Sequence, residues 1–151
     1  GVPFILSGEE MLRDKKGVHN SYKSPDSINR LDWNNLKRYP GVFDYYSKLI
    51  ALRKAHPAFR MGNAEEVRKN LVFLDAPEGV VAFRLKNNAG GDRWKDIIVV
   101  LNANKTEASV NIPEGQYTKV LADGKVDENG LGTVSGTDVK VAAQSATIIH
   151  N

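Results

Sequence analysis

The second part of the chain is a series of short segments rich in Val, Ile, Thr and aromatic residues. Turn sequences such as NNAGGD, EG and DG separate these segments, and nine of the 13 glycines fall in residues 61–151. Apolar and polar residues alternate in TEASVNI and GQYTKVL, which is typical of strands with one buried face. This pattern predicts an antiparallel β-sandwich. The expected strands lie near residues 66–74, 80–86, 96–102, 106–112, 116–122 and 138–149.

Residues 1–60 have a different pattern. The apolar run Val2–Leu6 predicts a strand that is buried on both faces, as in a parallel sheet. Residues 13–40 have almost no helical or strand periodicity, and a loop of this length is usually functional. Apolar residues recur with helical spacing between Pro40 and Pro57, which predicts a helix over residues 42–56.

These patterns divide the chain into residues 1–60 and residues 61–151, with the boundary near residues 58–63. The chain opens directly on an apolar strand pattern without a methionine. We therefore expect it to be part of a larger protein.

Composition and charge argue against several classes of function. No cysteine is present, so disulfides and cysteine metal sites are excluded. No apolar run reaches the ~20 residues that a membrane-spanning helix needs. Residues 1–60 hold 11 Lys and Arg against 6 Asp and Glu, a net +5, whereas residues 61–151 hold 10 against 12, a net −2. The basic residues are mixed with acids rather than clustered, so we expect no nucleic-acid partner.

The sequence also predicts no metal and no cofactor. His19, His56 and His150 are scattered without the spacing of metal ligands. The acidic group of Asp123, Asp127 and Glu128 lacks the ligand spacing of a calcium loop, and we expect a solvated turn there.

Three segments of the chain resemble a known family of proteins. The segment GVPFILSGEEMLRDKKGVHNSYKSPDSINRLDW resembles the eighth β-strand and following loop of type I pullulanases, in the α-amylase superfamily (glycoside hydrolase family 13). FDYYSKLIALRKAHPAF resembles their eighth barrel helix, and VVLNANKTEASVNIPEG resembles a passage of their C-terminal β-sandwich domain. The resemblance implies a mainly β fold: an amylase-type C-terminal antiparallel β-sandwich over residues 61–151, preceded by a strand-loop-helix remnant of a TIM barrel over residues 1–60.

The resemblance further implies a parent enzyme that hydrolyses α-1,6-glucosidic linkages in pullulan, starch or glycogen with retention of configuration. That chemistry needs two carboxyl groups ~5–5.5 Å apart, and the superfamily carries its catalytic acids after barrel strands four, five and seven. One strand and one helix of eight pairs cannot close a barrel. We therefore expect no catalytic residue in this chain, which would act as a structural or accessory part that needs the missing catalytic barrel. A secreted, a cell-surface and a cytoplasmic location are all compatible with the sequence.

The pair Asp26 and Arg30, in DSINR, is the best candidate for contact with substrate. In the superfamily, a pair at this spacing holds a glucose unit, and both groups form charge-assisted hydrogen bonds to hydroxyls. The alternative is a surface ion pair on one turn of helix. Four further residues match the same loop pattern, with scaffolding of the loop as their alternative role: Arg13, Asn20, Tyr22 and Asn29.

Two other features of this loop point away from chemistry. Glu9 and Glu10 are adjacent, so their side chains point apart and cannot flank one bond. The alternative is that one of them anchors the strand end through hydrogen bonds. Trp33 is expected to be a buried anchor for the return of the loop rather than a platform for sugar.

A rival hypothesis is a stand-alone carbohydrate-binding or adhesive sandwich. It requires a row of exposed aromatic residues on one sheet face. Phe73 and Phe83 lie in apolar strand patterns that predict burial, and Trp94 is either exposed on a hairpin or a cap on the core. Tyr117 is the remaining aromatic residue of residues 61–151.

Self-association is the last expectation. The helix over residues 42–56 carries more apolar side chains than one contact surface covers, and the strand at residues 2–6 lacks its neighbours. Exposed apolar surface of this kind favours association. The helix residues concerned are Tyr45, Tyr46, Leu49, Ile50 and Leu52.

Overall fold

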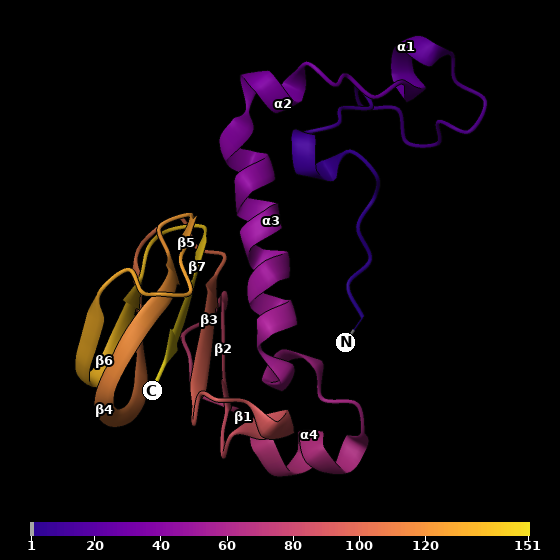
Figure 1. The fold of residues 1–151 in the computed structure, drawn as a ribbon. Helices are drawn as coiled ribbons and strands as arrows, with labels where there is room; N and C mark the ends of the chain where they lie inside the picture. The colour runs from indigo at the N-terminus through magenta and orange to yellow at the C-terminus, as the bar shows by residue number, and fades with distance from the viewer. Residues whose placement is uncertain (1) are drawn as a thin grey trace. The chain divides into compact units, whose positions relative to one another are not determined.

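The computed structural model describes residues 2–151, so residue 1 of the expected barrel remnant lies outside the described residues. The chain forms two compact units, Gly1–Ser47 and Lys48–Asn151. Figure 1 shows the order of the helices and strands. The helical elements are η1 (Glu9–Met11), α1 (Asp26–Asn29), α2 (Asn35–Arg38), α3 (Pro40–Ala55), η2 (Pro57–Arg60), α4 (Ala64–Asn70) and η3 (Ala89–Gly91). The strands are β1 (Leu71–Phe73), β2 (Val80–Leu85), β3 (Ile97–Asn102), β4 (Ala108–Ala122), β5 (Lys125–Val126), β6 (Thr133–Val141) and β7 (Ser145–His150).

The strand predicted at residues 2–6 does not form, and this expectation was wrong. Residues 2–6 have no strand assignment, and Val2 and Phe4 are exposed. A strand is held by hydrogen bonds to a neighbouring strand, and the described residues of the first unit contain no other strand. The apolar pattern therefore marks a segment that has no strand to pair with among the described residues of the first unit.

The predicted helix is confirmed as α3, which begins at Pro40 and ends at Ala55. Pro40 suits the first turn, where its missing N–H is not needed. The C-terminal carbonyl groups of α3 are satisfied by Arg60, whose side chain donates to the carbonyl oxygens of Arg53 and Lys54 at 2.9 and 3.0 Å.

The second unit is an antiparallel β structure, as the sequence predicts. Its strands follow the order β1-β2-β3-β7-β4-β5, and β6 pairs with β4. Figure 1 shows the paired strands β4 and β6 facing the layer of β2 and β3. The core lies between these layers, which fits a sandwich. Its buried residues are Ala82, Ile98, Val100, Val110, Ile112, Tyr117, Val139, Val141 and Ile149.

The second half of α3 covers the other face of this sheet. Strand β3 is buried on both faces, because Ile97 and Val99 alternate with the core residues Ile98 and Val100. Ile148 pairs with Val99 and lines a pocket together with Leu49 and Leu52 of α3. Helix residues 48–55 are therefore packed with the sheet within the second unit.

Four of the predicted strand segments were wrong in detail. The segment near residues 66–74 begins as helix α4, because the Asn63 side chain accepts a hydrogen bond from the Glu66 N–H at 2.8 Å and caps it. The segments near 106–112 and 116–122 are one strand, β4. The segment near 138–149 is divided between β6 and β7 by a turn in which Gln144 has a φ of 48°.

Strand β4 continues through the sequence IPEG because it bulges there. Its register with β6 shifts between Asn111 and Gly115. The Tyr117 hydroxyl donates to the Pro113 carbonyl at 3.0 Å. A Cβ atom on Gly115 would lie 3.1 Å from the Tyr117 ring. The Glu-Gly pair is therefore a bulge under a buried tyrosine rather than a hairpin turn.

The domain boundary expected at residues 60/61 stays a prediction. The two compact units meet between Ser47 and Lys48, inside α3. Ala58 of η2 is buried, as is Leu52 of α3. These contacts favour a sandwich domain that begins before residue 60.

Candidate functional site

Asn29 is the centre of a hydrogen-bond network in the long loop of the first unit. Its side-chain nitrogen donates to the carbonyl oxygens of Ser21 and Ser24, both at 2.8 Å. Its side-chain oxygen accepts from Lys15 Nζ at 2.6 Å, and Lys15 Nζ also donates to Ser21 Oγ at 2.9 Å. Both amide hydrogens of Asn29 are thus used inside the loop, which fits the scaffolding role considered for it.

Arg13 also acts within the loop. Its guanidinium donates to the carbonyl oxygens of Ser7 and Asn29 at 3.1 and 2.5 Å. Beside it, the Gly8 N–H donates to the Glu10 carboxylate at 2.9 Å. Glu10 is therefore an anchor of the local backbone, the alternative role considered for the acidic pair.

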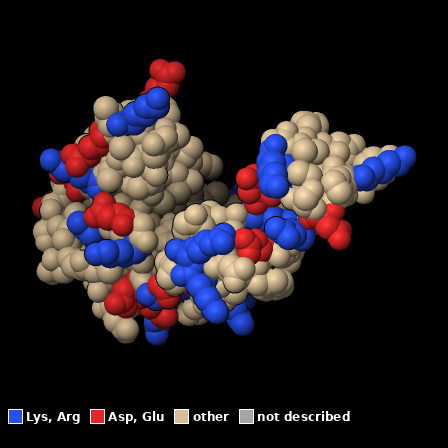
Figure 2. Space-filling model, turned by 90° about the horizontal axis from the view of Figure 1, so that it is seen from above, with Lys and Arg blue, Asp and Glu red and all other residues tan. Residues whose placement is uncertain are grey.

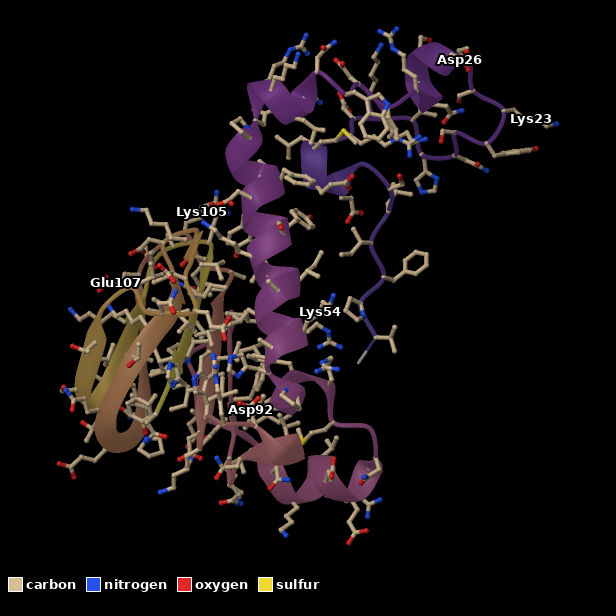
Figure 3. All side chains as sticks on the ribbon, in the orientation of Figure 1. Lys23, Asp26, Lys54, Asp92, Lys105 and Glu107 are labelled. Carbon is tan, nitrogen blue, oxygen red and sulfur yellow. The ribbon has the colours of Figure 1, made fainter. Side chains whose placement is uncertain are left out.

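The other predicted contact residues are exposed. Asp26 begins α1, and the Arg30 N–H donates to the Asp26 carbonyl at 2.8 Å. No ion pair joins the two side chains among the described residues. Tyr22 is 75% exposed, and Asn20 is exposed as well. Figure 3 shows Asp26 on the α1 turn, with Lys23 on the neighbouring stretch of loop. Asp26, Arg30, Asn20 and Tyr22 are thus exposed to solvent, and Lys23 Nζ lies 5.4 Å from the centroid of the Tyr22 ring.

The expected burial of Trp33 was wrong, because its ring is 64% exposed. It lies at the turn that leads into α2, between Asp32 and Asn34. The buried anchor of this unit is instead Met11 of η1, which is 2% exposed.

A second cluster of polar and aromatic side chains lies in the second unit, around His56. His56 is fully buried, and its Nδ1 atom lies 2.8 Å from Asp92 Oδ1. Asp92 also accepts the N–H groups of Trp94 at 3.0 Å and Ala58 at 3.1 Å. Because an ionised carboxylate only accepts, we assign the imidazole proton to Nδ1. Figure 3 shows Asp92 beside the C-terminal end of α3.

Three flat rings stack beside this carboxylate. The Trp94 ring lies between His56 and His150, with ring centroids 3.4 and 3.7 Å away and interplanar angles of 19° and 8°. Burial, followed by nearby His56 and Arg93, lowers the pKa of His150 to about 4, while Asp92 opposes this shift. The rings join the end of α3, the segment before β3 and the end of β7.

Glu128 closes the cluster from the loop after β5. Its Oε1 atom lies 3.3 Å from His56 Nε2 and also pairs with Arg93. The predicted solvated turn therefore holds for Asp127, which accepts the Asn129 N–H at 2.9 Å, but not for Glu128. The sequence analysis did not predict this cluster. The one signal was that His56 and His150 each follow an apolar segment.

The aromatic residues of the sandwich do not form an exposed row. Trp94 and Tyr117 are buried, so Trp94 is a cap on the core. Phe73 was expected to be buried but is 69% exposed, because it lies on the short edge strand β1. Phe83 is half-buried next to it, with ring centroids 6.3 Å apart. One exposed ring does not provide the aromatic row that a stand-alone carbohydrate-binding sandwich needs.

Residues 2–151 contain no group of three His, Cys, Asp or Glu side chains that could hold a metal ion. None of their helices is both long and apolar enough to cross a membrane. Figure 2 shows Lys and Arg interspersed with Asp and Glu on the face drawn.

Comparisons with known proteins give one consistent result. Residues 67–126 match the family model "Pullulanase, all-beta domain". The chain is 40% identical over 146 residues to the pullulanase of Bacillus subtilis strain 168. It superposes on the pullulanase from Bacillus acidopullulyticus with a TM-score of 0.95 and 48% identity over 100% of this chain. The pullulanase of Anoxybacillus sp. LM18-11, solved in complex with maltotetraose, gives a TM-score of 0.88 and 32% identity over 100% of this chain.

These matches cover most of this chain but little of each relative. The alignment to the Bacillus subtilis protein spans 89% of this chain and 20% of that protein. The two structural matches span 18% and 21% of the solved chains. The chain thus spans about a fifth of the length of these relatives.

Proposed function

We propose that this chain is part of a pullulanase and serves as an accessory segment of an enzyme that hydrolyses α-1,6-glucosidic linkages in α-glucans. The observation that carries this proposal is the structural match over the whole chain at 48% identity. Residues 61–151 would brace a catalytic barrel, and the loop of the first unit would contribute contacts to the glucan. The catalytic carboxyl groups would come from outside this chain.

The exposed residues of the loop support the glucan-binding part of the proposal. Asp26 is the first residue of α1, and Arg30 directly follows its last residue. In the part of the chain that the structure describes, no ion pair joins the two side chains. A carboxylate and a guanidinium at this spacing can bind neighbouring hydroxyls of one sugar. Tyr22 offers an exposed ring, and Asn20 an exposed amide. Arg13 and Asn29 would hold the loop in shape behind them.

The test is a chimera in which this chain replaces the matching 18% of the Bacillus acidopullulyticus pullulanase. We expect the chimera to hydrolyse pullulan. Asp26→Ala and Arg30→Ala should each lower its kcat/KM by about 10- to 100-fold, because a hydrogen bond to a charged group contributes ~1.5–3 kcal/mol. Steady-state release of reducing sugar measures this effect.

Two comparisons make the result specific. Lys37→Ala removes an exposed charge from α2 in the same unit and should leave kcat/KM unchanged. The unfused chain should release no reducing sugar. A chimera that folds but cannot hydrolyse pullulan would contradict the accessory role, whereas an active chimera insensitive to Asp26→Ala and Arg30→Ala would contradict only the contact residues.

We also propose that the isolated chain self-associates through exposed apolar surface. Ile50 of α3 is 48% exposed, whereas Leu49 and Leu52 line a pocket with Ile148. Burial of one such side chain contributes ~1.5–3 kcal/mol. Sedimentation velocity should therefore show dimers or larger species as concentration rises, and Ile50→Lys should reduce them. The same distribution for Ile50→Lys and the unchanged chain would exclude this surface.

A further inference from the structure

We propose that the stacked rings of His56, Trp94 and His150, together with Asp92 and Glu128, form a proton-sensitive latch that fastens the end of α3 to the sheet. The latch is a conformational device of the second unit and does not depend on the proposed glucan chemistry. Lowering the pH would open it.

The cluster connects three separate segments of the second unit. His56 follows α3, Trp94 precedes β3, and His150 ends β7. The three rings lie in one stack, with neighbouring centroids 3.4 and 3.7 Å apart. Asp92 adds hydrogen bonds from His56 and from the Ala58 N–H of η2. The connection between helix and sheet is therefore concentrated in a few side chains.

Proton uptake at His150 Nδ1 has no compensating hydrogen-bond partner. Its Nδ1 atom is buried and has no hydrogen-bond partner. His56 differs from His150, because Glu128 Oε1 lies 3.3 Å from its buried Nε2 atom. A buried nitrogen that gains a charge without an acceptor is strongly unfavourable.

The charged groups around His150 act in opposite directions: Arg93 disfavours proton uptake by His150, and Asp92 favours it. His56 faces it across Trp94, from the end of α3. The segment before β3 contributes the cation of Arg93 and the anion of Asp92. The cross-strand partners of His150 are Ile97 and Thr118, and both are uncharged. Glu128, from the loop after β5, is already paired with Arg93.

The direction of the pH effect follows from the shift at His150. An unperturbed imidazole titrates near pH 6.5, whereas the pKa of His150 in the fold is lowered to about 4. The unfolded chain therefore binds more protons between these values. The stability that neutral His150 contributes is complete above pH 6.5 and is lost as the pH falls through about 4.

The experiment monitors the latch by the fluorescence emission of Trp94. The full chain has two tryptophans, so Trp33→Phe leaves Trp94 as the single fluorophore. We expect its emission to shift to the red as the pH falls through about 4, because the stack opens. Adding His150→Phe keeps a stacking ring without a titrating nitrogen, and should move the midpoint of this shift down by about one pH unit or more.

His19→Phe is the matched control, because His19 is an exposed histidine of the first unit. It should leave the midpoint unchanged. If His150→Phe lowers the far-UV circular dichroism at pH 7, His150→Gln takes its place, with the same expected shift. The proposal is overturned if the variant at His150 titrates with the parent midpoint. It is also overturned if NMR of the His150 ring places its titration near pH 6.5 in the folded chain.

Discussion

Asp92→Ala is expected to lower the free energy of unfolding of the chain by about 3 kcal/mol or more, because each buried donor left without its acceptor costs ~1–3 kcal/mol. The Asp92 carboxylate is buried and accepts from His56 Nδ1 and from the backbone N–H groups of Ala58 and Trp94. Alanine leaves all three donors without a partner in a site that water does not reach. Urea unfolding at pH 7, followed by far-UV circular dichroism, measures the change.

The cause can be separated from a general effect of charge. Asp75→Ala removes an exposed carboxylate and should change the free energy of unfolding by less than ~0.5 kcal/mol. In a double-mutant cycle, the interaction free energy between Asp92→Ala and His56→Ala should be ~0.5–3 kcal/mol, because the two side chains are in contact. A loss below ~1 kcal/mol for Asp92→Ala would mean that the buried carboxylate is not a structural anchor.

Local patterns were sufficient for the elements whose signals do not depend on distant residues. Pro40 and Pro57 bracket α3, and the predicted helix is confirmed. The strands β2 and β3 were predicted to within a residue at each end because turns flank them. The antiparallel sandwich followed from the same regularity.

The wrong predictions have two physical causes. Either a local cap or turn changed the secondary structure, or the strand needed for pairing was absent from the described residues of the first unit. Asn63 caps α4 and overrides the strand-like residues that follow. The turn at Gln144 separates two strands that read as one. The run Val2–Leu6 has the composition of a buried strand, but composition alone cannot supply the strand it must pair with.

The candidate sites differ in the same way. The loop residues Asp26 and Arg30 were predicted from one contiguous motif, and their exposure is compatible with that prediction. The cluster of His56, Asp92 and His150 could not be predicted, because its members are separated by dozens of residues and none belongs to a motif. Only the register of β3 and β7 brings the end of the chain next to Trp94.

The position of the N-terminal boundary of the sandwich domain should determine which piece of the chain folds. We expect residues 48–151 to fold cooperatively and residues 61–151 to lose most of their stability. The shorter piece lacks Leu52, His56 and Ala58, all buried in the second unit. Without them, the face of the sheet that holds Ile97 and Val99 would be opened to water.

The expected loss can be set against the stability of a domain. Burial of one large apolar side chain contributes ~1.5–3 kcal/mol, and the loss of the two Asp92 contacts from His56 and Ala58 adds the cost of an under-satisfied buried carboxylate. Together these approach the ~5–15 kcal/mol by which a domain is stable. Amide NMR spectra of the two pieces test this: residues 48–151 should give dispersed resonances, and residues 61–151 collapsed ones. Equal dispersion and equal urea midpoints would instead support the boundary at residues 60/61, and would mean that α3 lies on the sandwich without helping to hold it together.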